Sequence, residues 1–363
     1  MSRLLLISLG QLTGAVLESM ARSGRFEEIV VASRSPERAR MKANNARVGA
    51  AIEGRFPRIE AAGFDLNDED AGSRLAQIRP DVIFAAPSLM PWWAIDRLSE
   101  PKRALARAVP FGGFIAFHLA PMLRLRDAWV ASRLRAPLIN GSYPDVVNAV
   151  LHATGPAPTS GVGNVVEAVP KIRFAAAEAL GVGAEHVSVK LVAQHAFEYF
   201  LYSAERHERL PPYLVKVVVD GRDVSESVRA RIAEPFPIPY DLDFNLFTAS
   251  ACAILLPALL SDHEVATHVP GPEGLIGGYP VLASRNGVRL DLPREWSRER
   301  AVATNRASLP WDGIAELEGD GGVRFAGETA SALRRLLGRT VERLKAADAP
   351  SFAAELRAAL VAA

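Results

Sequence analysis

Residues 4–14 read Leu4-Leu-Leu-Ile-Ser-Leu-Gly10-Gln-Leu-Thr-Gly14, and residues 29–34 read Ile29-Val-Val-Ala-Ser33-Arg34. The first apolar run is typical of a strand that is buried on both faces. Apolar residues then recur at helical spacing over residues 12–23, and a glycine follows. A second apolar run over residues 27–32 predicts another strand. The chain is therefore expected to open with a strand, a tight turn, a helix and a second strand.

The turn between the first strand and the helix resembles a dinucleotide-binding loop. The motif G-x-G-x-x-G maps here as Ser8-x-Gly10-x-x-Thr13, so only the central glycine, which lets the backbone approach the phosphates, is in register. A helix that begins after such a turn directs free N–H groups at a pyrophosphate. A purely structural strand–helix–strand unit is the alternative. We predict that the cofactor contacts five residues of this turn: Ser8, Gly10, Gln11, Leu12 and Thr13.

The end of the second strand bears on the choice between NAD and NADP. An acidic residue there would bind the ribose 2′-hydroxyl of NAD. This strand instead ends with Ser33 and Arg34, followed by Ser35, and an arginine beside hydroxyl groups suits a 2′-phosphate. We predict that Ser33 and Arg34 bind NADP, with NAD as the alternative cofactor. The other interpretation of Arg34 is a solvated loop residue.

The composition is that of an ordinary globular protein. The 363 residues are 49% hydrophobic and 23% charged, with a formal net charge of +1. Nothing in this balance indicates nucleic acid or an anionic membrane as a partner, and no apolar stretch is long enough to span a bilayer. The single cysteine, Cys252, excludes an internal disulfide and fits a reducing compartment, so we expect a cytoplasmic location.

Strands and helices alternate over the first part of the chain. Further strands are predicted at residues 61–67, 80–88 and 136–140, with helices between them. This alternation indicates a doubly wound parallel sheet, which we assign as a Rossmann domain over residues 1–150. Ligands of such sheets bind at the carboxyl ends of the strands. We therefore expect four strand-end residues to contact the cofactor: Ala85, Ala86, Pro87 and Asn140.

Two tryptophans follow the fourth predicted strand. Trp92 and Trp93 lie at the start of a helix expected to run to about residue 108. Beside the cofactor, Trp92 would form one wall of a substrate pocket, although such a pair is often divided between core and surface. The next helix is predicted at residues 113–132. Its His118 is interpreted as a core residue because the surrounding positions are apolar.

The pattern changes after residue 150. A Gly/Pro-rich junction over residues 155–164 precedes a predicted helix and then shorter, alternating segments. Asp220-Gly221 and Asn286-Gly287 are turn dipeptides that predict hairpins. We therefore expect an α+β substrate domain over residues 151–330.

The end of the chain is predicted to be helical. Apolar residues recur at helical spacing over residues 330–344 and 351–362. We assign residues 331–363 as C-terminal helices that pack on the body of the protein.

Three segments of the second half resemble the lactate/malate dehydrogenase superfamily. They are Gly161-Val-Gly163-Asn-Val-Val-Glu167 with the helix that follows, Gln194-His195-Ala196, and Gly278-Tyr-Pro-Val-Leu-Ala-Ser-Arg-Asn-Gly-Val288. The first half is similar to saccharopine-dehydrogenase-like Rossmann proteins, with Ala32-Ser-Arg34 and Ala85-Ala-Pro87. The resemblance implies a nicotinamide-dependent dehydrogenase, and it favours a homodimer or a higher homo-oligomer.

The resemblance also implies a catalytic pair. In the superfamily a histidine and a carboxylate exchange a proton with the substrate oxygen while the cofactor exchanges hydride. His195 matches the histidine and Glu167 matches the carboxylate. A carboxylate would hold the imidazole in one tautomer and stabilise the imidazolium. A hydrogen-bonded structural histidine is the alternative for His195.

The superfamily's substrate-binding arginine is expected one helical turn after the carboxylate, where this chain has Pro170. Lys171 and Arg173 are the possible substitutes, Lys171 as a catalytic residue and Arg173 as a substrate contact, although lysine lacks the bidentate fork. Tyr143 is a further expected substrate contact. Thr248 matches a hydroxyl that lines the superfamily's pocket, with a helix-buried threonine as the alternative. The missing arginine favours a partly apolar substrate.

Together these features predict an NADP-dependent oxidoreductase. It would transfer hydride to or from a carbonyl/alcohol, or an imine/amine, of a small-molecule substrate. The alternatives are a saccharopine- or opine-type dehydrogenase acting at a C–N bond, and a non-enzymatic dinucleotide-binding protein. The histidines show no paired spacing and no zinc motif, so no metal site is predicted.

Overall fold

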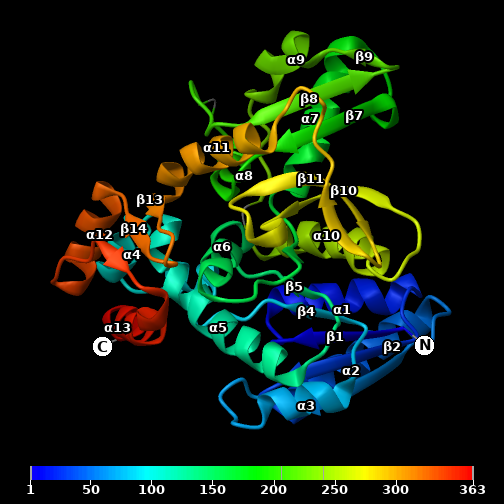
Figure 1. Ribbon diagram of the computed structural model, residues 1–363, viewed down its shortest axis with the longest axis vertical. Helices are drawn as coiled ribbons and strands as arrows, with labels where there is room; N and C mark the ends of the chain where they lie inside the picture. The colour runs from blue at the N-terminus through cyan, green and yellow to red at the C-terminus, as the bar shows by residue number, and fades with distance from the viewer. Residues whose placement is uncertain (1, 206, 240, 362–363) are drawn as a thin grey trace.

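The computed structural model describes residues 2–205, 207–239 and 241–361. Its first half is built on a six-stranded parallel sheet with the strand order β3-β2-β1-β4-β5-β6. This arrangement confirms the predicted doubly wound Rossmann sheet. Figure 1 labels β1, β2, β4 and β5 of this sheet. The strands are β1 (Arg3–Ile7), β2 (Glu28–Ser33), β3 (Arg58–Gly63), β4 (Val82–Ala85), β5 (Leu138–Asn140) and β6 (Ser160–Gly161).

The central strands are apolar throughout because helices cover both faces of the sheet. Side chains alternate between the faces, so Leu5 and Ile7 enter one core while Leu4 and Leu6 enter the other. The sheet is thus buried on both sides, as the continuous apolar runs indicated. The covering helices are α1 (Gln11–Ser23) and α2 (Pro36–Ile52) on one face, and α3 (Ala71–Ile78) and α5 (Ile115–Ser132) on the other.

In the second half, helices accompany the antiparallel three-stranded sheets β7-β8-β9 and β10-β11-β12, which confirms the predicted α+β character. The turn dipeptides Asp220-Gly221 and Asn286-Gly287 lie at the predicted hairpins. The strands are β7 (Val187–Val192), β8 (Leu214–Val219), β9 (Arg222–Asp223), β10 (Val265–Pro270), β11 (Gly278–Ser284) and β12 (Gly287–Leu290). The helices are α7 (Val165–Leu180), α8 (His195–Leu201), α9 (Ser225–Ile232), α10 (Asn245–Ala258) and α11 (Arg298–Ser308).

The end of the chain differs from the prediction. The helix expected over residues 330–344 ends earlier, because Gly338 adopts a left-handed conformation (φ 74°) that closes the last helical turn. A small antiparallel sheet, β13-β14-β15, contributes two strands before this helix, and its third strand, β15, lies where the helix was expected to continue. The elements are β13 (Ile314–Leu317), β14 (Val323–Phe325), α12 (Gly327–Leu337), β15 (Arg343–Leu344) and α13 (Ala349–Val361).

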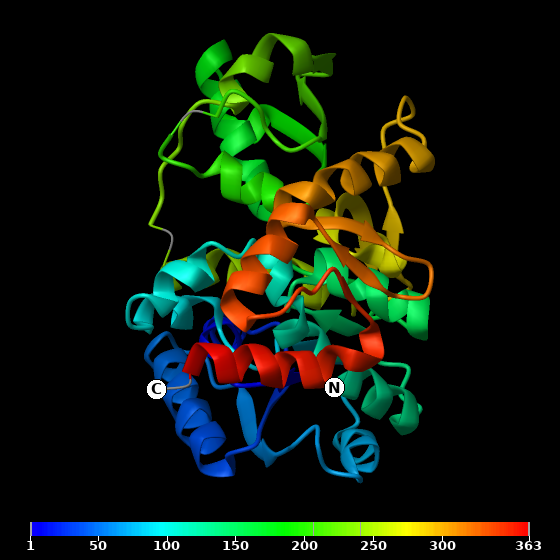
Figure 2. The same cartoon turned by 90° about the vertical axis from the view of Figure 1, so that its left-hand side faces the viewer.

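The last helix, α13, returns to the parallel-sheet half. Phe352, Leu356 and Leu360 share a core with residues of α5, and Figure 2 shows α13 lying across that half of the molecule. The helix was predicted to end at residue 362, which lies outside the described residues.

Two segments of the first half are also corrected. The junction predicted at residues 155–164 contains β6, which adds the sixth parallel strand, after the helix α6 (Pro144–Thr154). The single helix predicted from Trp92 to about residue 108 is two short ones, η1 (Trp92–Arg97) and α4 (Lys102–Arg107). Pro101 separates them because a proline cannot continue a helix as a hydrogen-bond donor. Two further 3₁₀ turns carry site residues, η2 (Phe111–Phe114) and η6 (Leu309–Asp312).

No helix within the described ranges is long and apolar enough to cross a membrane.

Candidate active site

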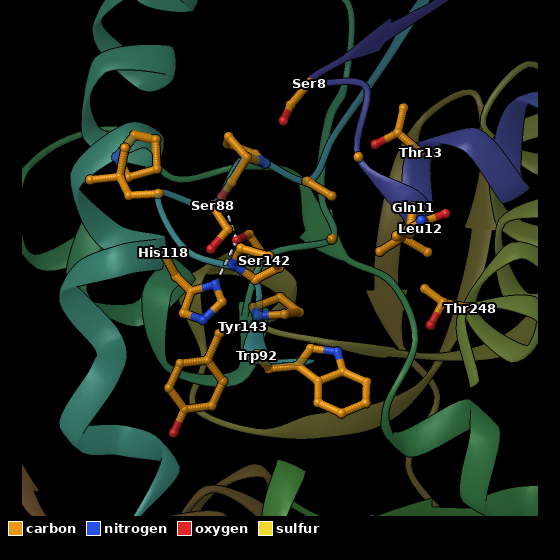
Figure 3. A pocket seen from close by; sticks show the side chains of 18 of the residues that line it. Ser8, Gln11, Leu12, Thr13, Ser88, Trp92, His118, Ser142, Tyr143 and Thr248 are labelled. Atoms are coloured by element: carbon orange, nitrogen blue, oxygen red, sulfur yellow. Dashed lines mark hydrogen bonds between the residues drawn. The ribbon is translucent and has the colours of Figure 1, made fainter. Parts of the chain in front are cut away.

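A cavity of about 980 Å³ lies at the carboxyl edge of the parallel sheet. Loops after β1, β2, β4 and β5 line one part of it, and α8, α10 and η6 line another. Figure 3 shows Ser8 and Thr13 on one side of this space, with His118, Tyr143 and Trp92 on another. The carboxyl ends of the strands therefore converge where the sequence placed them.

The predicted dinucleotide turn lines the cavity with all five of its residues: Ser8, Gly10, Gln11, Leu12 and Thr13. Gly10 caps the N-terminus of α1, and a Cβ built on it would meet no atom within 4 Å. The space in front of Gly10 is therefore open to a ligand that approaches the backbone. The Thr13 hydroxyl is buried without a hydrogen-bond partner, and Ser8 adopts a left-handed φ of 72°.

The loop after β2 brings two arginines to the same cavity. Ser33 and Arg34, which were predicted to bind the cofactor, line it, and Arg38 of α2 joins them. The side chain of Ser35 caps α2 by accepting a hydrogen bond from the Arg38 backbone N–H. That cap fixes the start of the helix relative to the strand end. Asp65 also lines the cavity, where its carboxylate accepts hydrogen bonds from Asn67.

The four predicted strand-end residues divide into two groups. Ala86 and Pro87 line the cavity, whereas Ala85 and Asn140 do not. Asn140 is fully buried, and its amide bonds to Asn148 and to the backbone of Ser142. The Asn140 side chain therefore stabilises the loop after β5 by hydrogen bonds and does not itself face the cavity.

The imidazole of His195 is paired with Asp312 and not with the predicted Glu167. Its Nδ1 lies 3.0 Å from Oδ2 of Asp312, a residue of η6 that lies 117 positions later in the sequence. Asp312 also accepts hydrogen bonds of 2.7 Å from the hydroxyl of Tyr143 and from the amide of Gln194. With Nδ1 engaged, Nε2 is the His195 nitrogen left to meet a substrate.

The charges of this cluster set its protonation. Burial alone would lower the pKa of His195, but the charge of Asp312 and its hydrogen bond, with Asp145 and Glu167, outweigh burial and raise that pKa. Burial would raise the pKa of Asp312, yet its partners His195, Tyr143 and Gln194 lower it. The pair therefore favours an aspartate beside an imidazolium.

Aromatic rings fix the orientation of His195. Phe111 stacks on the imidazole with ring centroids 4.7 Å apart, and Tyr143 meets it edge-on at 5.1 Å. Tyr143 lines the cavity, as expected of a substrate contact, but its hydroxyl is used by Asp312. Burial and Asp312 raise the Tyr143 pKa well above its ordinary value, so the phenol stays a hydrogen-bond donor.

Glu167 of α7 lines the cavity together with a second carboxyl, Glu198 of α8. Both side chains are only 5% exposed. Burial raises the pKa of each, and for Glu198 the neighbouring Glu167 adds to the effect. Thr248 lines the same part of the cavity and lies beside Glu167, where it was expected to contact substrate.

Lys171 and Arg173 lie away from the cavity. The ammonium of Lys171 donates hydrogen bonds to the backbone carbonyls of Leu201, Ile232 and Glu234, at 2.6 to 3.0 Å. Burial lowers its pKa to about 8. Arg173, two residues further along α7, is exposed. The structure thus gives Lys171 three backbone contacts that join α7 to α8 and to the end of α9.

His118 is buried, as predicted, but it also lines the cavity. The hydroxyl of Ser142 donates to the carbonyl of Pro87 at 2.6 Å, so it accepts from Nδ1 of His118 at 2.9 Å (Figure 3). Burial and the nearby His195 lower the pKa of His118 to about 4. His118 is therefore neutral at physiological pH and presents an acceptor at Nε2.

Trp92 lines the cavity as expected, and Trp93 does so too. Arg97 lies over the ring of Trp93, 4.3 Å from its centroid. Within the described residues, no group of three or more His, Cys, Asp or Glu side chains is placed to hold a metal ion.

Sequence reasoning missed Asp312, Glu198 and Phe111. Asp312 lies 117 residues after His195 in a segment without a motif. Glu198 had a local signal, because it lies one helical turn after His195 on the same helix. Phe111 had none, since it stands in a Pro-Phe-Gly-Gly loop.

The architecture is that of the lactate and malate dehydrogenases: a parallel sheet of Rossmann order followed by an antiparallel second half. No protein-family model matches the chain, and the comparison with curated proteins finds no match. The likeness lies in the fold.

Three solved structures illustrate it. A minor L-lactate dehydrogenase from Enterococcus mundtii shares 13% identity at a TM-score of 0.57, covering 87% of this chain and 99% of its own. A malate dehydrogenase from Plasmodium falciparum, in complex with NADH, shares 13% identity at a TM-score of 0.53. The match covers 92% of this chain and 99% of the malate dehydrogenase. A malate dehydrogenase from Salinibacter ruber shares 17% identity at a TM-score of 0.51, and the match covers 92% of this chain and 98% of that one. The predicted resemblance to this superfamily is thus confirmed at the level of fold, whereas the likeness to saccharopine-dehydrogenase-like proteins stays a prediction.

Proposed function

We propose that this protein is an NADP-dependent oxidoreductase that acts on a carbonyl/alcohol or imine/amine group of a small molecule. The observation that carries the proposal is the hydrogen-bonded pair of His195 and Asp312 in the same cavity as the turn at Gly10. A proton-transfer group and a dinucleotide turn in one cavity are the two parts that hydride-transfer chemistry needs.

The cavity fits a dinucleotide at its Gly10 end. Open space in front of Gly10 admits a pyrophosphate to the N–H groups that begin α1. The unpartnered hydroxyl of Thr13 adds a hydrogen-bonding group in the same turn. Ala86 and Pro87 would border the nicotinamide, since they follow the strand next to β1. A malate dehydrogenase of the same fold was solved with NADH.

NADP in preference to NAD is supported by the loop after β2. Arg34 and Arg38 line the cavity there, and the strand ends in Ser33 where an NAD-binding chain would place a carboxylate. Two guanidinium groups suit a 2′-phosphate because each offers several charge-assisted hydrogen bonds.

Bound NADP would supply or accept the hydride. The protein's own part is the proton. In the reducing direction, the imidazolium of His195 donates a proton from Nε2 to the reacting oxygen or nitrogen, and in the oxidising direction the neutral ring takes it back. Asp312 keeps the other proton on Nδ1 and stabilises the positive charge. Phe111 and Tyr143 hold the ring in place between these steps.

Cofactor binding is the direct test. Titration of the purified protein with NADPH and with NADH, followed by enhancement of the reduced nicotinamide fluorescence, should show saturable binding with tighter affinity for NADPH. If neither dinucleotide binds at millimolar concentration, the proposal fails. A pH profile of turnover in wild-type and His195→Asn protein then tests the proton step, because the variant should lose turnover while it keeps NADPH affinity.

We also propose a homo-oligomer, as the sequence led us to expect. Large apolar side chains are exposed on α2, at Met41, Val48 and Ile52, and on α10, at Leu246 and Ile254. Such surfaces are common where subunits meet. Light scattering after size-exclusion chromatography would measure the mass, and a mass of one chain at micromolar concentration would contradict the proposal.

A further inference from the structure

The most unusual buried groups in the cavity are the carboxyls of Glu167 and Glu198. Both oxygens of Glu167 and one oxygen of Glu198 are buried without a hydrogen-bond partner of ordinary geometry. The two side chains line the cavity from adjacent helices and interact with each other. Two buried acids that face each other are unfavourable for the fold alone, and their placement in the cavity wall points to a ligand.

The backbone makes room for this pair. Gly163 has a φ of 94°, and a Cβ added to it would lie 2.7 Å from Oε1 of Glu167 and 3.2 Å from Cγ2 of Thr248. Any other residue at position 163 would push the Glu167 carboxyl out of place. Gly163 in the loop before α7 thus leaves the room that the carboxyl occupies on the cavity wall.

No lysine or arginine among the described residues forms an ion pair with Glu167 or Glu198, although four arginines line the same cavity. Two further acids, Asp145 and Asp312, lie close enough to affect the protonation of this cluster, and His195 is the basic group that faces them. The end of the cavity around His195 therefore carries more acidic than basic groups.

Aromatic side chains line the same cavity, and two of them, Tyr199 and Phe200, directly follow Glu198 on α8. Phe200 and Trp311 line the cavity with their rings at 5.0 Å, edge to face, and Tyr199 and Phe244 line it as well. Aromatic faces attract organic cations and accept their apolar substituents. An acidic pair within such a wall suits an alkyl- or arylammonium group better than a carboxylate or a hydrated metal ion.

We propose that Glu167 and Glu198 bind an organic cation, so that the substrate carries a protonated amine attached to an apolar group. The identity of this molecule as the substrate rests on the proposed oxidoreductase function, whereas its binding does not. The missing substrate arginine then has a simple explanation, since an ammonium group needs an acid at this place. A metal ion is the less suitable occupant because the described residues hold no group of three potential ligands here.

Cation binding should also expel a proton from the pair. The groups that face it are Asp145 and His195, with the phenol of Tyr202 and the thiol of Cys252 nearby. Burial favours the protonated form of the pair when the site is empty, because it raises the pKa of both acids. A bound ammonium stabilises the ionised form, so the proton leaves to solvent.

Isothermal titration calorimetry with three matched probes tests this proposal. Benzylammonium, benzyl alcohol and benzoate have the same ring and differ in charge. Benzylammonium should bind the wild-type protein at least tenfold more tightly than the other two, with proton release detected by comparing buffers of different ionisation enthalpy. Glu167→Gln and Glu198→Gln should each remove that preference. The control variant Glu178→Gln, at an exposed position of α7, should keep the preference for benzylammonium.

Equal binding of benzyl alcohol or benzoate, binding of benzylammonium without proton release, or displacement of benzylammonium by Mg²⁺ would each overturn the proposal. The proton measurement uses the wild-type protein, so it holds even if a variant does not fold. Repeating the titration with and without NADPH separates the two proposals. Loss of NADPH binding with intact benzylammonium binding contradicts only the proposed function, and the reverse result contradicts only this inference.

Discussion

Nδ1 of His195 lies 3.0 Å from the carboxylate of Asp312, although 117 residues separate the two in the sequence. The contact joins the start of α8 to η6, and both elements line the cavity. Tyr143 and Gln194 donate to the same carboxylate, so Asp312 is held as an ionised acceptor. Asp312 thereby orients the His195 ring through Nδ1 and leaves Nε2 available to a substrate.

Asp312→Asn should lower turnover of an identified substrate by about 100-fold, because the imidazolium loses its counter-charge and the ring loses its fixed tautomer. The pKa of His195 should fall, which a histidine Cε1–H titration by NMR would follow. NADPH affinity should stay within a few-fold. An unchanged pH–rate profile in this variant would contradict the role of Asp312.

The same pair should leave a signature in stability against pH. The pKa of His195 is raised in the folded state, so its contribution is present below about pH 6.5 and is lost as pH rises through the folded value. The pKa of Asp312 is lowered, so its contribution is present above about pH 4 and is lost as pH falls through the folded value. The stability difference between wild type and Asp312→Asn should therefore be largest between about pH 4 and 6.5. Urea unfolding across that range measures it, and a flat difference would disagree with the pairing.

Arg34→Ala should weaken NADPH binding by roughly 10- to 100-fold, because a hydrogen bond to a charged group is lost. NADH lacks the 2′-phosphate and should bind the variant and the wild type alike. Arg40→Ala is the matched control, since Arg40 is exposed on α2 and does not line the cavity. Equal weakening of both dinucleotides in Arg34→Ala would show that Arg34 has no role in choosing the phosphate.

Ser8→Gly should stabilise the protein by about 1 kcal/mol, because Ser8 occupies a left-handed conformation that glycine adopts without a Cβ penalty. Its backbone hydrogen bonds, from its N–H to Ala32 and from Gly10 to its carbonyl, do not need the side chain. Denaturant unfolding measures the change. Ser8→Ala keeps the Cβ and should bring no gain, so an equal gain from both variants would rule out the conformational explanation.

Lys171→Met should destabilise the protein by about 3 kcal/mol, because three buried carbonyls lose the ammonium that they share. Arg173→Met, at an exposed position of the same helix, should have little effect. Thermal unfolding compares the two. Per folded molecule, turnover should be unchanged in Lys171→Met, and a specific loss of turnover with normal stability would restore the catalytic role that the sequence suggested.

Much of the parallel-sheet half could be predicted from local pattern. The strand at residues 4–7, the turn at Gly10 and the helix after it are short-range features, and the cavity-lining residues Ser33, Arg34 and Pro87 follow from strand ends. Helix ends were less certain: Gly338 closes α12 inside a segment whose apolar spacing continues past it. The strand β6 is two residues long and carries no periodicity to detect.

The amino-acid sequence by itself determined the sheet, the turn at Gly10 and the candidate His195, because apolar periodicity and glycine spacing act between neighbours in the chain. Only the tertiary structure decided which carboxylate serves that histidine. Glu167 was the choice by motif, yet Asp312 holds the imidazole, and Glu167 faces the cavity beside Glu198. Hydrogen bonds and charge depend on distances of a few ångströms between side chains, and packing of segments far apart in the sequence sets those distances.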